Sequence, residues 1–371
     1  MMTDDNIDSE ILQKYRPLIE LGKGAYGIVW KAEVRETKVP VALKKIIGAF
    51  NNDVDAQRTY REVYLLQSIN HKNIVKLLNV HRAKNDYDLY LVFEYMHTDL
   101  YHVIYGEGIL NDDQKVYICF QLFSILLYFE SLKIVHRDIK PANILIDNEC
   151  RVKMADFGLS RTVGSKLDDG EPVMTQYVAT KLYRAPEVMM GSKYYTFPVD
   201  MWSVGCIIAE MFMLKPIVLM HSQNIPDQLM RFFSIFGKPS EEDLSSILIS
   251  RPLEILKCLN PKENISLAKV LGRSDKDLLD LITRCLEFNP TKRLTPTQAI
   301  EHNFFKNSRV AYILQNTVVY KSQFPLPIVL REEVRLSASQ YRKEMYRLIL
   351  EKKSERIIKM LNSKVPMSIS N

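Results

Sequence analysis

The pattern of apolar and polar positions divides the chain into two parts of different character. Up to about residue 95, β-branched residues form short apolar runs separated by glycines and polar turns, which is typical of strands. The runs that predict strands are 18–21, 28–34, 39–47, 74–81 and 89–94. Between the third and fourth runs, Val63, Leu66 and Ile69 recur at helical spacing within residues 55–69. This part therefore predicts five strands and one helix.

The later part of the chain has mainly helical periodicity. Residues 114–132 predict a long helix, residues 144–146 and 152–154 two short strands, and helices dominate to about residue 305. We expect an α+β, bilobal fold, in which a small β lobe joins a larger helical lobe, and ligand sites favour such clefts. The expected boundaries are a polar tail over 1–14, a domain over 15–305 (small lobe 15–95, hinge 94–98, large lobe 99–305) and an extension over 306–371.

The extension contains a strong helical pattern over residues 337–360. Tyr341, Met345, Leu348 and Ile349 share one face. The rest of the helix carries seven basic residues: Arg342, Lys343, Arg347, Lys352, Lys353, Arg356 and Lys359. A basic face of this kind is usually solvated, whereas binding to nucleic acid would show as salt-sensitive affinity.

Composition narrows the class of protein. The 371 residues are 47% hydrophobic and 25% charged, which is typical of a soluble globular protein, and the net charge of +6 is too small to indicate nucleic acid as the partner. Five widely spaced cysteines without a CxxC pair argue against disulfides or a zinc site and favour a reducing compartment. The most apolar stretch, 203–220, is interrupted by Glu210 and Lys215, so it predicts a buried helix and no membrane span.

A glycine-rich segment lies between the first two predicted strands. Residues 22–29 read GKGAYGIV, which matches G-x-G-x-x-G-x-V. Glycines let the backbone approach phosphate oxygens without a Cβ clash. A plain tight hairpin explains the segment equally well, and the strand that follows it argues against a dinucleotide site, which needs a helix there.

A lysine follows on the third predicted strand. Residues 41–44 read VALK, and a lysine near the end of an apolar strand can direct its ammonium group to two phosphates if a carboxylate fixes its direction. Glu62, in the following helix, is the candidate for that carboxylate. The alternative is an exposed lysine on an edge strand, which is what we expect of Lys45.

Three further motifs follow in a fixed order. Residues 136–143 read HRDIKPAN, which matches H-R-D-x-x-x-x-N; an aspartate there can accept the hydrogen of an attacking hydroxyl, and the asparagine can ligate Mg²⁺. Asp156-Phe157-Gly158 comes thirteen residues after Asn143, and Ala185-Pro186-Glu187 comes 27 residues after Gly158. Any one of the shorter motifs could arise by chance, but the order and spacing of all five could not easily do so.

With these five motifs, the chain resembles the eukaryotic protein kinases from Tyr15 to about Phe305. The resemblance implies a bilobal fold, ATP and Mg²⁺ as cofactors, and phosphoryl transfer to protein hydroxyls. It makes Asp138 the base, Lys140 a stabiliser of transferred charge, Lys44 and Glu62 the phosphate-positioning pair, and Asn143 and Asp156 the metal ligands. Asp200 and Arg293 resemble structural residues that brace the catalytic loop and Glu187, respectively.

The same resemblance implies an ATP pocket in which Phe93 forms the back wall. The residues it assigns to ATP binding are Leu21, Gly22, Lys23, Gly24, Ala25, Tyr26, Gly27, Val29, Ala42, Lys44, Phe93, Glu94, Met96, Asp99 and Leu145.

Within the family, the sequence is similar to the mitogen-activated protein kinases. Thr175-Gln176-Tyr177 resembles their dual T-x-Y phosphorylation motif, and residues 217–271 resemble their C-lobe insert. The segments 93–96 and 336–342 look most like the atypical extracellular-signal-regulated kinases of the seven/eight type. This resemblance implies a Ser/Thr kinase that acts before proline.

The resemblance also implies a phosphorylation switch at Thr175 and Tyr177. A phosphate adds about −1.5 to −2 charge and orders a loop where basic side chains receive it. The positions that match the receiving groups of the family are Arg58, Arg61, Arg137, Arg161, Lys181 and Arg184.

Two departures from the family pattern affect this switch and the docking of partners. Lys181-Leu182 stands where most of the family has Arg-Trp, and lysine offers a point charge where arginine offers a planar fork, so the proline preference and the hold on a phosphate at Tyr177 are open. Residues 304–310 carry no acidic cluster, so the usual docking site is not carried over.

The leading hypothesis is therefore an active kinase, and the alternative is a non-catalytic scaffold with a kinase fold. Degraded kinases usually lose Lys44, Asp138 or Asp156 equivalents, and this sequence keeps all three. The expected partners are proteins with Ser/Thr-Pro sites, together with an upstream kinase unless the chain phosphorylates itself. We expect a cytoplasmic location, with the nucleus as the alternative.

Overall fold

The structure is a computed structural model, and its chain divides into two compact units. It describes residues 7–24, 27–106, 110–163, 182–191, 196–214, 222, 224–245, 247, 259–261, 263–315 and 335–363. The first unit, here the β unit, comprises 1–70, 75–95 and 334–371, and the second, the helical unit, comprises 71–74 and 96–333. A five-stranded antiparallel sheet in one unit and a helical second unit fit the expected fold class.

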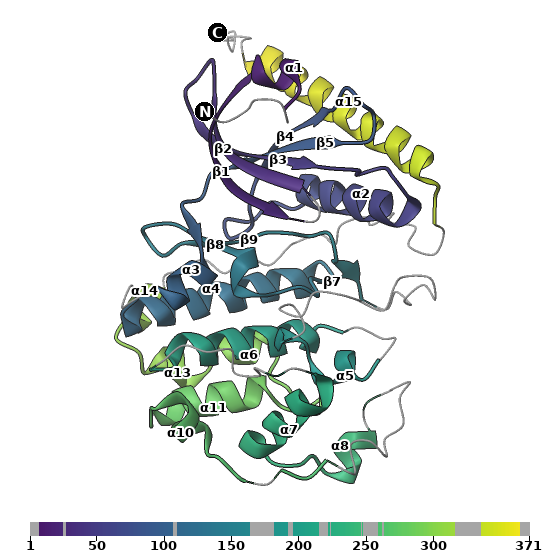
Figure 1. Cartoon of the computed structure of the whole chain (residues 1–371). Coiled ribbons are helices and arrows are strands. Elements are labelled where there is room, and N and C mark those ends of the chain that lie inside the picture. Colours follow the sequence, from purple (N-terminus) through teal and green to yellow (C-terminus); the bar gives the residue numbers. More distant parts are fainter. Residues whose placement is uncertain are drawn as a thin grey trace, which may run out of the picture. The chain divides into compact units, whose positions relative to one another are not determined.

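The sheet of the β unit has the order β1-β2-β3-β5-β4, and all its neighbours are antiparallel (Figure 1). Its strands are β1 (Tyr15–Gly24), β2 (Gly27–Val34), β3 (Pro40–Ile46), β4 (Leu77–Arg82) and β5 (Leu89–Glu94). The five predicted strands are present, although β4 begins three residues later than predicted. Val41, Leu43, Tyr90 and Val92 belong to the buried cluster of the sheet, so alternate positions of β3 and β5 form its core.

Helix α2 (Asp53–Ser68) follows β3. Asn52 caps it, because the Asn52 side chain accepts a hydrogen bond from the backbone N–H of Asp55 at 2.9 Å. Val63, Leu66 and Ile69, the residues at the predicted helical spacing, are all buried. The helix ends at Ser68, where Ile69 adopts an extended backbone conformation.

The expected polar tail is wrong for residues 7–14. A short helix α1 (Ser9–Leu12) lies there, and Ile7 and Ile11 join the buried cluster of the sheet. Asp8 anchors the segment, since its Oδ2 accepts a hydrogen bond from the backbone N–H of Lys84 at 2.7 Å and its N–H donates to the hydroxyl of Tyr90 at 3.1 Å. Two buried isoleucines add apolar contact to the sheet, so this segment is part of the β unit.

The C-terminal helix α15 (Ala338–Ser363) also belongs to the β unit, where it packs against α2 and β4 (Figure 1). Met345 is fully buried, and the ring of Tyr341 lies 5.7 Å from that of Tyr60 in α2. The backbone N–H of Ala338 donates to Asp53 Oδ1 at 2.7 Å. The apolar face predicted from the sequence therefore packs within the same chain.

Helix α15 also contacts the end of β4 and the turn between β4 and β5. Tyr346 donates its hydroxyl hydrogen to Asp86 Oδ1 at 3.0 Å, and the Arg82 guanidinium lies 4.0 Å from the Tyr346 ring centroid. Arg342 donates to the backbone oxygen of Asp86 at 3.2 Å, so one of the basic residues of α15 binds the sheet. The basic face was expected to be solvated, but Arg342 makes this contact within the chain.

The helical unit is built around two apolar helices, α4 (Asp112–Ser131) and α6 (Pro198–Phe212), and α4, α11 and α10 pack on α6. Its other helices are α3 (Leu100–Tyr105), α5 (Pro186–Met189), α7 (Ile225–Phe236), α8 (Glu241–Ser245), α10 (Leu267–Leu271), α11 (Lys276–Cys285), α12 (Pro296–Ile300), α13 (Asn303–Lys306) and α14 (Ala311–Gln315). Its strands are β6 (Thr98–Asp99), β7 (Ile134–Val135), β8 (Ile144–Ile146), β9 (Val152–Met154) and β10 (Arg161–Thr162), with a 3-10 turn over Pro141–Asn143. Every residue of α6 except Pro198 is buried, including Glu210, so the prediction of a buried helix holds for residues 203–212, although the helix begins five residues earlier than the predicted stretch 203–220.

Candidate active site

The glycine-rich segment forms the hairpin between β1 and β2 of the β unit. Gly24 pairs with Gly27, and Ala25 and Tyr26 between them lie outside the described residues. Gly27 has φ +146°, and a Cβ added to it would lie 1.8 Å from the backbone oxygen of Lys45. Only glycine fits this position, so the last glycine of the motif is explained by close backbone packing.

Strand register brings several of the predicted ATP-binding residues to one face of the sheet. Val29 is paired with Lys44, and Ala42 with Phe93. Cross-strand partners and alternate residues of one strand point to the same side, so these four side chains share a face. Leu21, Gly22, Lys23 and Gly24 lie at the end of β1, and Glu94 ends β5.

Lys44 and Glu62 form an ion pair. Lys44 Nζ lies 3.0 Å from Glu62 Oε1, and the Glu62 side chain is 6% exposed. The helix α2 thus carries the carboxylate that fixes the lysine of β3, as the sequence had suggested for this pair.

Lys45 differs from the expectation of an exposed edge-strand residue. β3 is the central strand of the sheet, and Lys45 Nζ lies 3.3 Å from Asp88 Oδ2 and 5.4 Å from the ring centroid of Tyr90. These two partners raise the pKa of Lys45, although its burial alone would lower it. The residue therefore ties β3 to the start of β5.

In the helical unit, Asp138 is held by two neighbours in the catalytic-loop motif. Lys140 Nζ lies 2.8 Å from Asp138 Oδ2, and Asn143 Nδ2 donates to the same oxygen at 3.1 Å and to the backbone oxygen of Asp138 at 2.9 Å. The other carboxylate oxygen, Oδ1, is buried and has no hydrogen-bond donor in the part of the chain that the structure describes. A buried acceptor without a donor is costly, so this atom is suited to receive a hydrogen bond from a bound hydroxyl.

The loop that carries Asp138 is anchored to α6 by Asp200. Asp200 Oδ2 accepts a hydrogen bond from the N–H of His136 at 2.7 Å, and Oδ1 accepts one from the N–H of Arg137 at 2.9 Å. Burial raises the pKa of Asp200, and these donors stabilise its anion. Arg137 has φ +71°, a strained conformation for a non-glycine residue that this anchoring maintains. Asp200 thus braces the loop as expected.

Oxygen ligands of the kind that Mg²⁺ prefers are present at the two predicted metal positions. Asn143 donates to Asp138 through Nδ2, so its amide oxygen remains available to bind a metal ion. Asp156 supplies a carboxylate, and its backbone has φ +62°. Mg²⁺ is usually held by one or two carboxylates together with substrate phosphates. Among the described residues there is no group of three or more His, Cys, Asp or Glu that could hold a metal ion.

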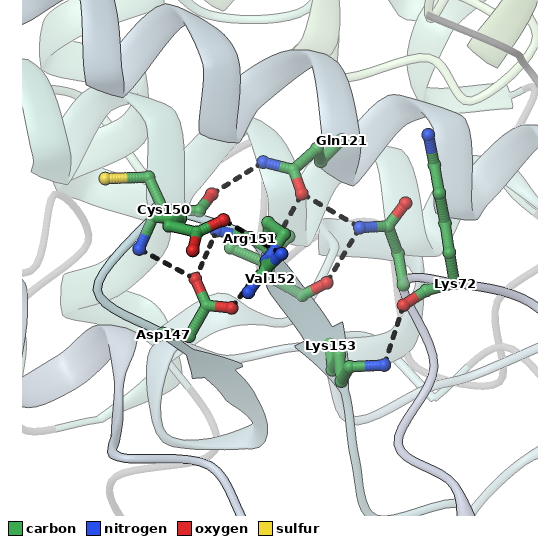
Figure 2. A network of polar contacts seen from close by, with 9 residues as sticks. Lys72, Gln121, Asp147, Cys150, Arg151, Val152 and Lys153 are labelled. Atoms are coloured by element: carbon green, nitrogen blue, oxygen red, sulfur yellow. Dashed lines mark hydrogen bonds and ion pairs between the residues drawn. The ribbon is translucent and has the colours of Figure 1, made fainter.

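A buried amide network positions the strand that leads to Asp156. Gln121 of α4 donates to the backbone oxygen of Cys150 at 2.7 Å and accepts from the N–H of Val152 at 3.0 Å (Figure 2). Asn73 donates to Gln121 and to the backbone oxygen of Val152 at 2.9 and 2.8 Å. These bonds fix β9, which ends two residues before Asp156.

A small pocket lies beside Asp138 within the helical unit. Arg137, Asp138 and Ile139 line one side, and Tyr183, Arg184, Ala185 and Val188 line the other, with α6 contributing Val199, Asp200 and Ser203. Arg137 and Arg184, two of the predicted phosphate-receiving residues, thus line the same pocket. Arg161 lies in β10, and its side chain donates to the backbone oxygen of Ser160 at 3.3 Å.

The remaining predicted site residues lie in the helical unit, in the β unit or outside the described residues. Met96 and Leu145 lie in the helical unit, and Asp99 is the N-cap of α3, where its side chain accepts from the N–H of His102 at 3.0 Å. Arg58 and Arg61 lie three residues apart on α2 in the β unit. Thr175, Tyr177 and Lys181 lie outside the described residues.

Comparison with known proteins settles the family. Residues 15–305 match the family described as Protein kinase domain. The chain belongs to the protein kinase family. Extracellular signal-regulated kinase 2 of Dictyostelium discoideum is 42% identical to this kinase, and the match covers 98% of both chains. Mitogen-activated protein kinase 15 of Xenopus laevis is 43% identical over 95% of this chain.

A third relative, extracellular signal-regulated kinase 7 of Drosophila melanogaster, is 40% identical over 89% of the chain. The kinase spans nearly all of the Dictyostelium relative, but 59% of the Xenopus protein and 36% of the Drosophila one. These relatives confirm the resemblance to mitogen-activated kinases of the atypical extracellular-signal-regulated type. In the described part of the kinase, no helix is long and apolar enough to cross a membrane.

Sequence reasoning missed Glu210 and Tyr105, which the structure joins to Tyr183 in the wall of the pocket. Glu210 of α6 is fully buried, and its carboxylate accepts hydrogen bonds from the hydroxyls of Tyr183 (2.8 Å) and Tyr105. The available signal was a single carboxylate within a strongly apolar helix, because a buried acid must find donors.

Proposed function

We propose that this kinase transfers the γ-phosphoryl group of MgATP to serine or threonine hydroxyls of proteins, with a preference for sites before proline. The observation that carries the proposal is the environment of Asp138: Oδ2 is held by Lys140 and Asn143, and the buried Oδ1 is left to accept a hydrogen bond beside an open pocket. This is the arrangement that a base needs when it orients and deprotonates an acceptor hydroxyl.

The other groups act by position and charge. Lys44, held by Glu62, would bind phosphate oxygens of ATP, and Lys140 would stabilise charge on the transferred group. Asn143 and Asp156 would hold Mg²⁺, which neutralises phosphate charge when bound. Because the residues supply orientation and electrostatic stabilisation, no covalent intermediate on the protein is required.

The proline preference is tested with two peptides that share one serine acceptor and differ only in the next residue. We expect kcat/KM for the Ser-Pro peptide to exceed that for the Ser-Ala peptide by about tenfold or more, because pocket contacts that distinguish one group are worth about 1–3 kcal/mol. Steady-state kinetics with radiolabelled ATP measure the ratio. A tyrosine acceptor in the same context is the control, and equal rates for Pro and Ala would remove the preference.

The proposed switch is phosphorylation of Thr175 and Tyr177. The groups proposed to receive the phosphates are Arg58, Arg61, Arg137, Arg161, Lys181 and Arg184. Arg58 and Arg61 belong to the β unit, and Arg137, Arg161 and Arg184 belong to the helical unit. Either an upstream kinase or the chain itself would add the phosphates.

Mass spectrometry of protein made in bacteria distinguishes these sources. After incubation with MgATP, we expect phosphate on Thr175 and Tyr177 of the wild type if the chain phosphorylates itself.

A Thr175→Ala/Tyr177→Phe variant tests the switch itself. We expect its activity to be at least about tenfold below that of the wild type, because the basic side chains then lack the phosphates that they would bind. A double variant as active as fully phosphorylated wild type would contradict the switch.

We also propose a cytoplasmic location, with the nucleus as the alternative. The four described cysteines, Cys119, Cys150, Cys206 and Cys285, are all free and buried, which suits a reducing compartment. Imaging of the tagged full chain tests this proposal, and a secreted product would contradict it.

A further inference from the structure

A surface tyrosine reaches a buried acid close to the pocket at Asp138. Tyr105, the last residue of α3, is 39% exposed, yet its hydroxyl donates to the carboxylate of Glu210, which is fully buried in α6. The second donor to this carboxylate is Tyr183, at 2.8 Å. The acid thus bonds two tyrosines that are far apart in the sequence.

Tyr183 belongs to the wall of the pocket that faces the catalytic loop. It lines the pocket together with Asp138, and its backbone oxygen accepts a hydrogen bond from Ser203 Oγ of α6 at 2.8 Å. The backbone oxygen of Leu182 accepts from Gln228 of α7 at 3.3 Å. Position and orientation of this wall are therefore set by contacts to α6 and α7.

The opposite wall is fixed to the same helix. Asp200 of α6 binds the N–H groups of His136 and Arg137, next to Asp138. Since α6 anchors both walls, the geometry between Asp138 and the segment around Tyr183 depends on the side chains that join them to α6.

Tyr105 brings a third element to this anchor. The helix α3 begins at the N-cap Asp99 and packs on the 3-10 turn Pro141–Asn143 of the catalytic loop. Burial raises the pKa of Glu210, while the two hydroxyls that donate to it lower that pKa. A hydrogen bond is stronger where water is excluded, so each hydroxyl stabilises this buried carboxylate more than it would at the surface. Loss of one hydroxyl would leave the carboxylate with a single donor and free the tyrosine ring of Tyr183 to shift.

We propose that Tyr105 is a positioning residue for the protein acceptor: through Glu210 it holds Tyr183, and so sets the pocket wall that faces Asp138. The inference rests on the proposed function, because it concerns the acceptor of the same phosphoryl transfer. It predicts a selective effect on the acceptor, with little effect on ATP, since the bond lies on the wall that faces the acceptor.

The test is steady-state kinetics of the full chain with ATP and a peptide that has one Ser-Pro site. We expect Tyr105→Phe to raise KM for the peptide about threefold to tenfold, the effect of one lost hydrogen bond, and to change KM for ATP less than about twofold. Tyr183→Phe should act in the same direction, and the double variant should deviate from the product of the two single effects, because both hydroxyls share one carboxylate.

Tyr101→Phe is the matched control. Tyr101 lies on the same helix, is 47% exposed, and its ring centroid is 4.8 Å from that of Tyr105, so this variant removes a hydroxyl without touching Glu210. It should leave the KM for peptide and the KM for ATP unchanged.

Glu210→Gln tests the carboxylate itself. It keeps the shape of the side chain and one acceptor oxygen, so its KM for peptide should lie between those of wild type and Glu210→Ala.

The possible results distinguish failure of the positioning role from failure of the proposed function. A Tyr105→Phe variant with wild-type KM for peptide, or with equal changes in both KM values and a lower melting temperature, overturns the positioning role while the wild type remains a kinase. A wild type that transfers no phosphate to Ser or Thr peptides overturns the proposed function, and this inference with it.

Discussion

Replacing Asp138 by asparagine is expected to lower kcat by about 10²- to 10⁴-fold, the contribution that positioned acid–base groups make. The substituted amide keeps the size of the side chain and can still contact Lys140 and Asn143. It loses the carboxylate that can take a proton, and Oδ1 is the atom with no donor in the described structure. The melting temperature and ATP binding should stay close to wild type.

This variant also separates an enzyme from a scaffold. A quenched-flow or steady-state assay with a Ser-Pro peptide measures kcat, and binding of a fluorescent ATP analogue measures the nucleotide site. Asp147→Asn, in the turn before β9, is a control outside the pocket. Activity of Asp138→Asn equal to wild type would mean that another group is the base, whereas no activity in either protein, with nucleotide binding intact, would favour the scaffold.

Replacing Arg293 by leucine is expected to lower the free energy of unfolding of the helical unit by about 3–5 kcal/mol, because a buried ion pair would lose one partner. Arg293 Nη1 and Nη2 lie 2.8 Å from the two carboxylate oxygens of Glu187, and both side chains are buried. The same guanidinium donates to the backbone oxygens of Glu287, Pro198 and Phe288. Leucine would remove the charged partner of Glu187 and one donor from each of these backbone oxygens.

Urea unfolding followed by circular dichroism measures this loss. Arg284→Leu is the matched control, since Arg284 is half exposed and lies 3.8 Å from Asp280, and an exposed pair of this kind is worth about 0–1 kcal/mol. Glu187→Gln should cost less than Arg293→Leu, since an amide can still accept from the guanidinium. A change below about 1 kcal/mol for Arg293→Leu would contradict the burial argument.

The elements predicted best were those whose burial is decided by local periodicity. The strands 89–94, 144–146 and 152–154 and the helix α4 are buried over most of their length, so their apolar runs locate them closely in the sequence. The burial of α6 was also predicted, but its bounds 198–212 differ from the predicted stretch 203–220. Ile7 and Ile11 were missed, since two apolar residues in a polar stretch do not define a helix. Their burial arises from the sheet that they cover, which is a tertiary effect.

The candidate site was predictable where function depends on spacing along the chain. Asp138, Lys140 and Asn143 lie within one short loop, and their contacts follow from the loop itself. The pairing of Glu210 with Tyr105 joins residues 105 positions apart, and no local pattern indicates which donors a buried acid finds. Glu62 could be suggested as the partner of Lys44, because its helix follows β3 directly.

The packing of α15 on α2 has a consequence for how the chain is made. About 270 residues lie between the end of α2 and the start of α15. At roughly 5–20 residues per second, synthesis of that stretch takes on the order of tens of seconds, during which the face of α2 at Tyr60 lacks the partner that Tyr341 later supplies. The β unit is therefore completed last although it begins first, and a ribosome stalled in the helical unit would hold an apolar helix face open to chaperones.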